Sequence, residues 1–201
     1  MTTIHNLRSF IEILEAAGQL VRIKQPVSLT HELADVAATL ERSGGGAPLF
    51  ENVTGSLWPI FAGGVANQKR AALALGCSEK EVTDVMGRAL DPKNGIAPVR
   101  VADAPWQANV QTGASVDART LPIPTHSRGD GGPFITGGVI VSRDPVSGRG
   151  NLSYNRMLCT GRPASVLMST SGGTSAPLWK AGPTRSRRSP SPLPSGWTRR
   201  L

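Results

Sequence analysis

Residues 7–24 decide the class of the first half of the chain: Leu7-Arg-Ser-Phe-Ile-Glu-Ile-Leu-Glu-Ala-Ala-Gly18, then Gln19, then Leu20-Val-Arg-Ile-Lys24. After Asn6, a residue type that caps helices, the apolar residues recur at helical spacing until Gly18 ends the pattern. Residues 20–24 alternate as a short strand does. A helix followed at once by a strand favours an α/β arrangement.

The same alternation of helix and strand continues to about residue 102. A second helix is predicted from Thr30 to the triple glycine 44–46, which indicates a flexible connection because it lacks the Gly-Lys-Ser/Thr ending of a phosphate-binding loop. Ser78 and Glu81 form the capping box of a later helix. The other elements predicted here are strands over 48–53, 57–62 and 98–102 and a helix over 67–76.

Beyond residue 103 the helical spacing disappears, which predicts a second, β-rich domain beginning near residue 110. A hairpin loop is predicted over 144–148, because Asp, Pro, Ser and Gly are turn-forming residues. The extended segments predicted in this region are 110–111, 121–123, 134–142, 150–159 and 165–170.

Composition and charge exclude several classes of protein. No run approaches 18 apolar residues, so no membrane-spanning helix is predicted, and residues 1–6 lack a signal-peptide pattern. Cys77 and Cys159 are too few for a disulfide scaffold or a cysteine-based zinc site, which favours a reduced, cytoplasmic protein. The net charge of +8 arises after residue 144, where nine basic and no acidic residues lie, so it does not indicate a folded nucleic-acid-binding face.

Two segments carry residues suited to chemistry. The loop over 121–138 places His126, Arg128 and Asp130 between prolines and glycines, a pattern that fits a ligand site and an ordinary structural loop equally well. The second segment is Gly150-Asn-Leu-Ser-Tyr-Asn-Arg-Met157. If it is a strand, Asn151, Ser153 and Asn155 share one face, and Leu152, Tyr154 and Arg156 share the other.

The second segment has two interpretations from its residue types. An amide oxygen can ligate Mg²⁺ or Mn²⁺, and an arginine can bind a carboxylate or phosphate through two hydrogen bonds. The polar face of an edge strand would have the same composition.

Five motifs in order give the chain a resemblance to the UbiD-type carboxy-lyases, reversible decarboxylases that use prenylated FMN. They are the segments 7–20, 47–53, 121–126, 130–138 and 151–157. The resemblance implies an α/β N-terminal domain followed by a split β-barrel that binds the flavin, α+β overall. Because family members are more than twice as long, it implies a first domain over 1–108 and part of the barrel over 109–171.

The resemblance also implies residue roles. Asn151 matches a ligand of a divalent metal, usually Mn²⁺, and Arg156 matches the arginine of the catalytic network. The implied substrate is an aromatic or α,β-unsaturated carboxylic acid, and a family-like homo-oligomer is compatible with the resemblance, although a partial chain disfavours it. The positions implied to line the prenylated FMN are Tyr154, Asn155, Arg156, Met168, Ser169 and Thr170.

The chain departs from the family pattern after residue 171. No histidine follows His126 and no acidic residue follows Asp144, so the family's remaining metal ligands and its acid are missing. Residues 172–201 are rich in Arg, Ser and Pro and are expected to be a disordered, non-family tail, which we hypothesise is a frame-shifted reading. The chain is therefore expected to be an inactive decarboxylase fragment. The alternatives are a non-catalytic binding subunit or, less favoured, a nucleic-acid binder through the tail.

Overall fold

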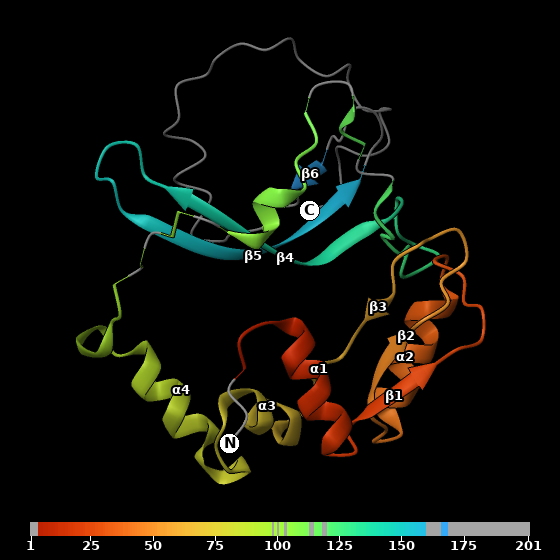
Figure 1. Ribbon diagram of the computed structural model, residues 1–201, viewed down its shortest axis with the longest axis horizontal. Coiled ribbons are helices and arrows are strands. Elements are labelled where there is room, and N and C mark those ends of the chain that lie inside the picture. Colours follow the sequence, from red (N-terminus) through yellow and green to blue (C-terminus); the bar gives the residue numbers. More distant parts are fainter. Residues whose placement is uncertain are drawn as a thin grey trace. The chain divides into compact units, whose positions relative to one another are not determined.

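The computed structural model describes residues 4–97, 99, 101–102, 104–112, 115–117 and 120–159, apart from the side chain of Trp106, and the backbone of 166–168. Figure 1 shows their mixture of helices and small sheets, an α+β arrangement. The described residues divide into two compact units, with residues 137–156 and 168 in the second and the others in the first. No described helix is long and apolar enough to cross a membrane.

The first unit begins as the sequence predicts. Helix α1 spans Leu7–Ala16 and strand β1 spans Leu20–Ile23. Asn6 caps α1, because its Oδ1 accepts a hydrogen bond from the Ser9 amide at 3.0 Å while Ser9 Oγ accepts one from the Asn6 amide. The further elements are α2 (Glu32–Arg42), β2 (Ala47–Phe50), β3 (Ile60–Phe61), α3 (Gln68–Leu75), η1 (Glu79–Glu81), α4 (Val82–Leu90), η2 (Pro92–Asn94) and η3 (Pro105–Ala108).

Strand β2 is the centre of the first unit. The sheet order is β1-β2-β3. Strand β1 runs parallel to β2, and β2 runs antiparallel to β3. All four residues of β2 are buried, as expected of a strand covered on both faces. Ala47 packs with Phe10 and Leu14 of α1, and Phe50 packs on the opposite face in a second cluster. That second cluster contains Val27, Leu33 and Val53.

The triple glycine does more than connect α2 to β2. A Cβ on Gly46 would lie 2.9 Å from the backbone carbon of Gln19, so this position requires glycine for close approach of two chain segments. Gly44, by contrast, has a φ of +73° and no atom within 4 Å of the place that a Cβ would occupy, which is the turn geometry expected after a helix. The predicted flexible connection is thus a tightly packed one at its last residue.

Several predicted elements differ in the structure. Residues 99 and 101–102 lie outside any strand, and Val99 is 86% exposed, so the described part of the predicted strand 98–102 is not one. The segments 110–111 and 121–123 are also irregular. A strand needs a partner to pair with, which a short apolar run cannot guarantee. Helix α2 is preceded by His31, with a φ of +67°, where the prediction began the helix at Thr30.

The second sheet contains the hairpin that was predicted. Its order is β4-β5-β6, with β4 over Phe134–Arg143, β5 over Gly150–Cys159 and β6 over Val166–Met168. The loop between β4 and β5 covers residues 144–149, close to the predicted 144–148 (Figure 1). This hairpin carries most of the candidate site residues.

Candidate functional site

The loop of the hairpin is fixed by Asp144. Its carboxylate accepts hydrogen bonds from the Val146 amide at 2.9 Å and from Ser147 Oγ at 2.8 Å, and these bonds lower the pKa of Asp144. The Gly148 amide donates to the Asp144 carbonyl at 2.8 Å, with Gly148 at a φ of +72° that favours glycine. The Asp144 amide in turn donates to the Arg149 carbonyl at 2.8 Å, which sets the register of the two strands.

Strand β5 alternates as the sequence predicts. Asn151, Ser153 and Asn155 are half-buried, whereas Leu152, Tyr154 and Arg156 are exposed. Because residues five positions apart in a regular strand point to opposite faces, Asn151 and Arg156 project in opposite directions. The segment that was expected to supply one site therefore divides its polar and cationic groups between two faces.

The half-buried face of the hairpin is polar. Asn155 Nδ2 donates to Ser153 Oγ at 2.8 Å and to the Ser153 carbonyl at 3.3 Å. Two further polar atoms, Asn151 Nδ2 and Ser142 Oγ, are buried without a hydrogen-bond partner among the described residues. Buried polar atoms are nearly always paired in folded proteins, so these two make this face a candidate binding site.

The donor set does not fit a manganese ion. No group of three His, Cys, Asp or Glu residues that could hold a metal occurs within the described residues. The Asn151 amide alone offers one neutral oxygen, and a doubly charged cation needs several ligands with negative charge among them. The orphaned Asn151 nitrogen and Ser142 hydroxyl suit an anionic group instead.

The loop around His126 is held by backbone hydrogen bonds. Thr125 exchanges hydrogen bonds with the chain before α2, its amide donating to the Leu29 carbonyl at 3.0 Å and its carbonyl accepting from the His31 amide at 2.9 Å. Asp130 Oδ2 accepts from the Ser127 amide at 3.0 Å. These contacts explain how the backbone and Asp130 hold the loop in place, and both interpretations of His126 and Arg128 stay open.

The other predicted cofactor-lining positions are reached in part. Met168 lies in β6, and of it the structure describes the backbone. Ser169 and Thr170 lie outside the described residues. The predicted common site of Asn151 with 168–170 therefore stays a prediction.

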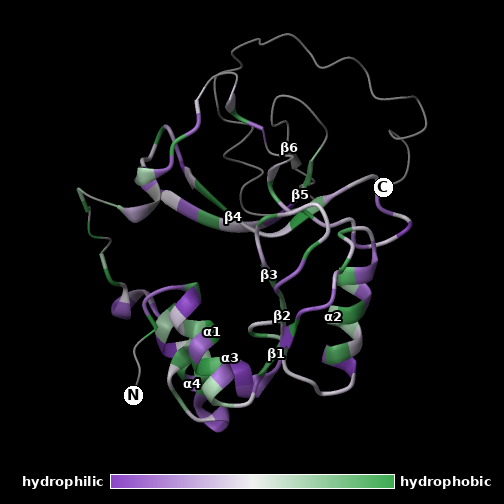
Figure 2. Cartoon of the chain, turned by 45° about the vertical axis from the view of Figure 1, so that its right-hand side comes forward, coloured by the Kyte–Doolittle hydropathy of each residue, from purple (hydrophilic) through white to green (hydrophobic). Residues whose placement is uncertain are grey.

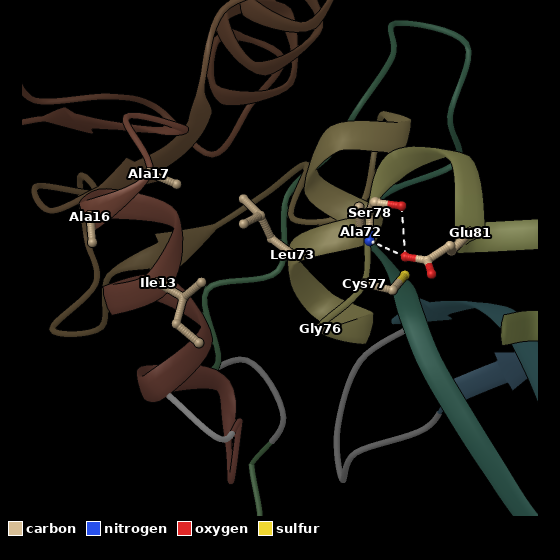
Figure 3. Close-up of a pocket in the computed structure, with 9 residues that line it drawn as sticks. All are labelled: Ile13, Ala16, Ala17, Ala72, Leu73, Gly76, Cys77, Ser78 and Glu81. Atoms are coloured by element: carbon tan, nitrogen blue, oxygen red, sulfur yellow. Dashed lines mark hydrogen bonds between the residues drawn. The ribbon is translucent and has the colours of Figure 1, made fainter. Parts of the chain in front are cut away.

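A cavity in the first unit has no counterpart in the sequence analysis. It has a volume of about 630 Å³ and lies where the C-terminal end of α1 faces the end of α3 (Figure 3). Glu81 accepts hydrogen bonds from the Ser78 hydroxyl at 2.7 Å and amide at 2.9 Å, which lower its pKa. The small residues at these helix ends were the available signal. The lining residues are Ile13, Ala16, Ala17, Ala72, Leu73, Gly76, Cys77, Ser78 and Glu81.

Comparison with family models decides the relationship. The 3-octaprenyl-4-hydroxybenzoate carboxy-lyase N-terminal domain matches residues 11–90, and the Rift-related domain of the same carboxy-lyase matches residues 98–190. This chain belongs to the UbiD family. The second match extends past residue 171, where the motifs of the sequence predicted that the family resemblance ends.

Known relatives agree with the family and are much longer. A curated Rhodospirillum rubrum protein, the "uncharacterized protein in cooM 5'region", is 34% identical over 82% of this chain and 35% of its own length. The UbiD-class enzyme HmfF from Pelotomaculum thermopropionicum, in an evolved dimeric form with prFMN, is 28% identical with a TM-score of 0.71, over 84% of this chain and 39% of that one. Apo 3,4-dihydroxybenzoic acid decarboxylase from Klebsiella pneumoniae is 30% identical with a TM-score of 0.69, over 85% and 38%. The chain thus spans little more than a third of these relatives.

Proposed function

We propose that this chain supplies the N-terminal α/β domain and the first part of a split β-barrel of a prenylated-FMN-dependent carboxy-lyase. The observation that supports this best is that the family-matched positions 151–157 all lie in β5. The buried, unpartnered Nδ2 of Asn151 belongs to this strand, and the buried, unpartnered Oγ of Ser142 belongs to β4. The division into 1–108, 109–171 and a separate tail over 172–201 belongs to the same proposal. So do a cytoplasmic location and the absence of nucleic-acid binding, whereas a family-like homo-oligomer is disfavoured for a partial chain.

The substrate of this proposal is an aromatic or α,β-unsaturated carboxylic acid. Arg156, exposed on β5, binds and orients the carboxylate, because a guanidinium matches two carboxylate oxygens at once. Tyr154 and Asn155 line the flavin together with Met168, Ser169 and Thr170. The flavin, when bound, supplies the electron sink that loss of carbon dioxide requires.

Proton transfer and metal binding are not supplied by the residues at hand. A general acid must lie within hydrogen-bond reach of the carbon it protonates, and no Asp or Glu follows Asp144 in the sequence. The described donor set does not suit Mn²⁺, so no step is assigned to a metal here. We therefore propose that the 201-residue chain by itself turns over no substrate.

Reconstitution tests this function directly. The purified chain is incubated with prenylated FMN, with and without Mn²⁺, and its flavin absorbance after gel filtration is recorded. Carbon dioxide release is then measured from cinnamate-like and hydroxybenzoate-like acids. We expect retained flavin absorbance and no turnover above background. Turnover would contradict the proposed inactivity of the chain.

The second candidate is a non-catalytic binding or interaction subunit. The observation that favours it is the missing acid together with an exposed apolar face on the hairpin, which includes Leu152 and Tyr154. Loss of all flavin absorbance during gel filtration would favour this candidate over the carboxy-lyase component.

A further inference from the structure

The two orphaned polar atoms of the hairpin lie on facing residues. The hydrogen bond from the Asp144 amide to the Arg149 carbonyl places residues 144 and 149 opposite each other. Two residues further from the loop on each strand of the antiparallel pair, Ser142 lies opposite Asn151. Directly opposed residues project from the same face with their Cβ atoms about 5 Å apart. Their half-burial agrees with this placement.

Both atoms are ready to donate a hydrogen bond. Ser142 Oγ and Asn151 Nδ2 are each buried, and neither has a partner in the described part of the chain. A hydroxyl donates one proton and an amide nitrogen two, so the pair presents donors toward the same region. Burial of unpaired donors destabilises a fold, so a strand pair that retains two of them is explained by a ligand that accepts from both.

The charge around the pair favours an anion over a metal. The hairpin's one acid, Asp144, has its carboxylate bound within the loop, and Arg149 lies two residues before Asn151, whereas Arg143 and Arg156 project from the opposite face. A phosphate carries a charge near −2 at neutral pH and several acceptor oxygens, so it can accept from both donors at once. A cation would find only the neutral oxygens of Ser142 and Asn151, because no group of three His, Cys, Asp or Glu that could hold a metal occurs in the part of the chain that the structure describes.

We propose that Ser142 and Asn151 form a phosphate-binding pair that holds the phosphate of the flavin mononucleotide directly, without a bridging metal. This rests on the proposed flavin-binding function and adds Ser142 to its binding residues. It also changes the role of Asn151 in this chain from metal ligand to hydrogen-bond donor. A substrate carboxylate has similar chemistry, so the test must distinguish the two anions.

The experiment compares flavins with and without the phosphate. FMN and riboflavin are titrated into the full chain with and without EDTA, and binding is followed by quenching of flavin fluorescence. We expect FMN to bind more tightly than riboflavin. Ser142→Ala is expected to weaken FMN binding about tenfold or more, the size of a lost hydrogen bond to a charged group, and to leave riboflavin unchanged.

Matched variants separate binding from folding. Ser142→Thr retains the hydroxyl on a strand-favouring residue and is expected to keep FMN binding. Asn151→Asp places a negative charge beside the phosphate and is expected to weaken FMN binding, whereas a metal site would gain affinity for Mn²⁺. Ser115→Ala, in an exposed turn of the first unit where its hydroxyl donates to the Thr112 carbonyl, is the control and is expected to leave FMN binding unchanged. The ligand-free melting temperature of Ser142→Ala should not fall, because no hydrogen bond is lost.

Three results would contradict the proposal that Ser142 and Asn151 bind the phosphate. They are equal affinity for FMN and riboflavin, full FMN binding by Ser142→Ala, and FMN binding that EDTA abolishes. If neither flavin binds, the proposed function fails, and inorganic phosphate then decides the pair alone. A phosphate-induced rise in melting temperature that is lost in Ser142→Ala, and absent with benzoate, supports it. No rise with phosphate, or an equal rise with benzoate, refutes it.

Discussion

The first unit and the hairpin place their apolar residues in opposite ways. In the first unit Leu14 and Phe50 are fully buried, and Arg70 is the one charged side chain that is buried among the described residues. In the hairpin the half-buried face carries Ser142 and Asn151, while Leu152 and Tyr154 are 68% and 79% exposed. Figure 2 shows hydrophilic and hydrophobic residues following one another along the chain of both regions, so the difference lies in which of them is covered.

The two regions therefore differ in how much of their stability comes from their own buried apolar side chains. The first unit encloses a core on both faces of β2, so its own residues supply the hydrophobic stabilisation. The hairpin has a half-buried polar face and exposed apolar side chains on the other face, so its own residues enclose less apolar surface. The face of the hairpin opposite the polar one carries Val139, Val141, Leu152 and Tyr154. We call these four residues the outer face.

The largest expected effect is on the core of the first unit. Leu14→Ala should lower the free energy of unfolding by about 2–5 kcal/mol, because the side chain is completely buried between α1 and β2. Leu152→Ala, the matched change on the outer face, should stay within about 0.5 kcal/mol. Urea unfolding followed by circular dichroism measures both. Similar losses for the two variants would show that the hairpin has a core of its own.

The second expected effect compares one glycine from each region. Gly46→Ala would force a Cβ to within 3.0 Å of the Gln19 backbone and should cost about 1–3 kcal/mol of unfolding free energy. Gly137→Ala, in β4, meets nothing within 4 Å and should be neutral or stabilising by up to about 1 kcal/mol. Chemical denaturation of the two variants checks this. A costly Gly137→Ala would indicate close packing on the hairpin that these distances exclude.

Acid should weaken each region through a different carboxylate. In the first unit Arg22 donates to Glu15 at 2.6 and 2.8 Å and to Glu51 at 2.5 Å, and the hydrogen bond from Arg22 lowers the pKa of Glu15. A depressed folded-state pKa contributes stability above the ordinary glutamate pKa of about 4.3, and this is lost as pH falls through the folded value. Asp144 follows the same rule in the hairpin loop.

Two variants separate these acid effects. Glu15→Gln should flatten the fall of unfolding free energy between about pH 5 and pH 2, without altering amide exchange in the hairpin loop. Asp144→Asn should speed amide exchange at Val146 and leave the acid limb of the first unit intact. Because the Glu15–Arg22 pair is exposed, added salt should reduce the Glu15 effect. A loop exchange rate that responds to Glu15→Gln would contradict the independence of the two regions.

The sequence predicted local features well and long-range pairing poorly. The cap at Asn6, the loop at Asp144 and the alternation around Asn155 all follow from residue types within a few positions. The predicted strand 98–102 fails in its described residues because strand formation depends on a partner that a short window does not contain. The packing of Gly46 on Gln19 is likewise set by segments 27 residues apart.

The candidate site could be predicted in part. Spacing of five already places Asn151 and Arg156 on opposite strand faces. The predicted loop 144–148 would pair Ser142 with Gly150, so only the observed hydrogen bond between Asp144 and Arg149 shows that Ser142 faces Asn151. The missing hydrogen-bond partners of those two residues could not be predicted, because they depend on the whole surrounding structure. The cavity of Figure 3 is also a product of packing, since its lining comes from helices far apart in sequence.

The smallest expected effect on stability tests the outer face itself. Leu152→Ser should change the free energy of unfolding by less than about 0.5 kcal/mol, because the side chain is already in water. It should nevertheless raise the soluble, monomeric fraction at high protein concentration, because exposed apolar side chains on neighbouring strands form a continuous hydrophobic patch that promotes association. Leu57→Ser, at a side chain 98% exposed in the first unit and outside the outer face, is the control. Light scattering during concentration of the three proteins checks this, and equal aggregation of all three would mean that the outer face attracts no partner.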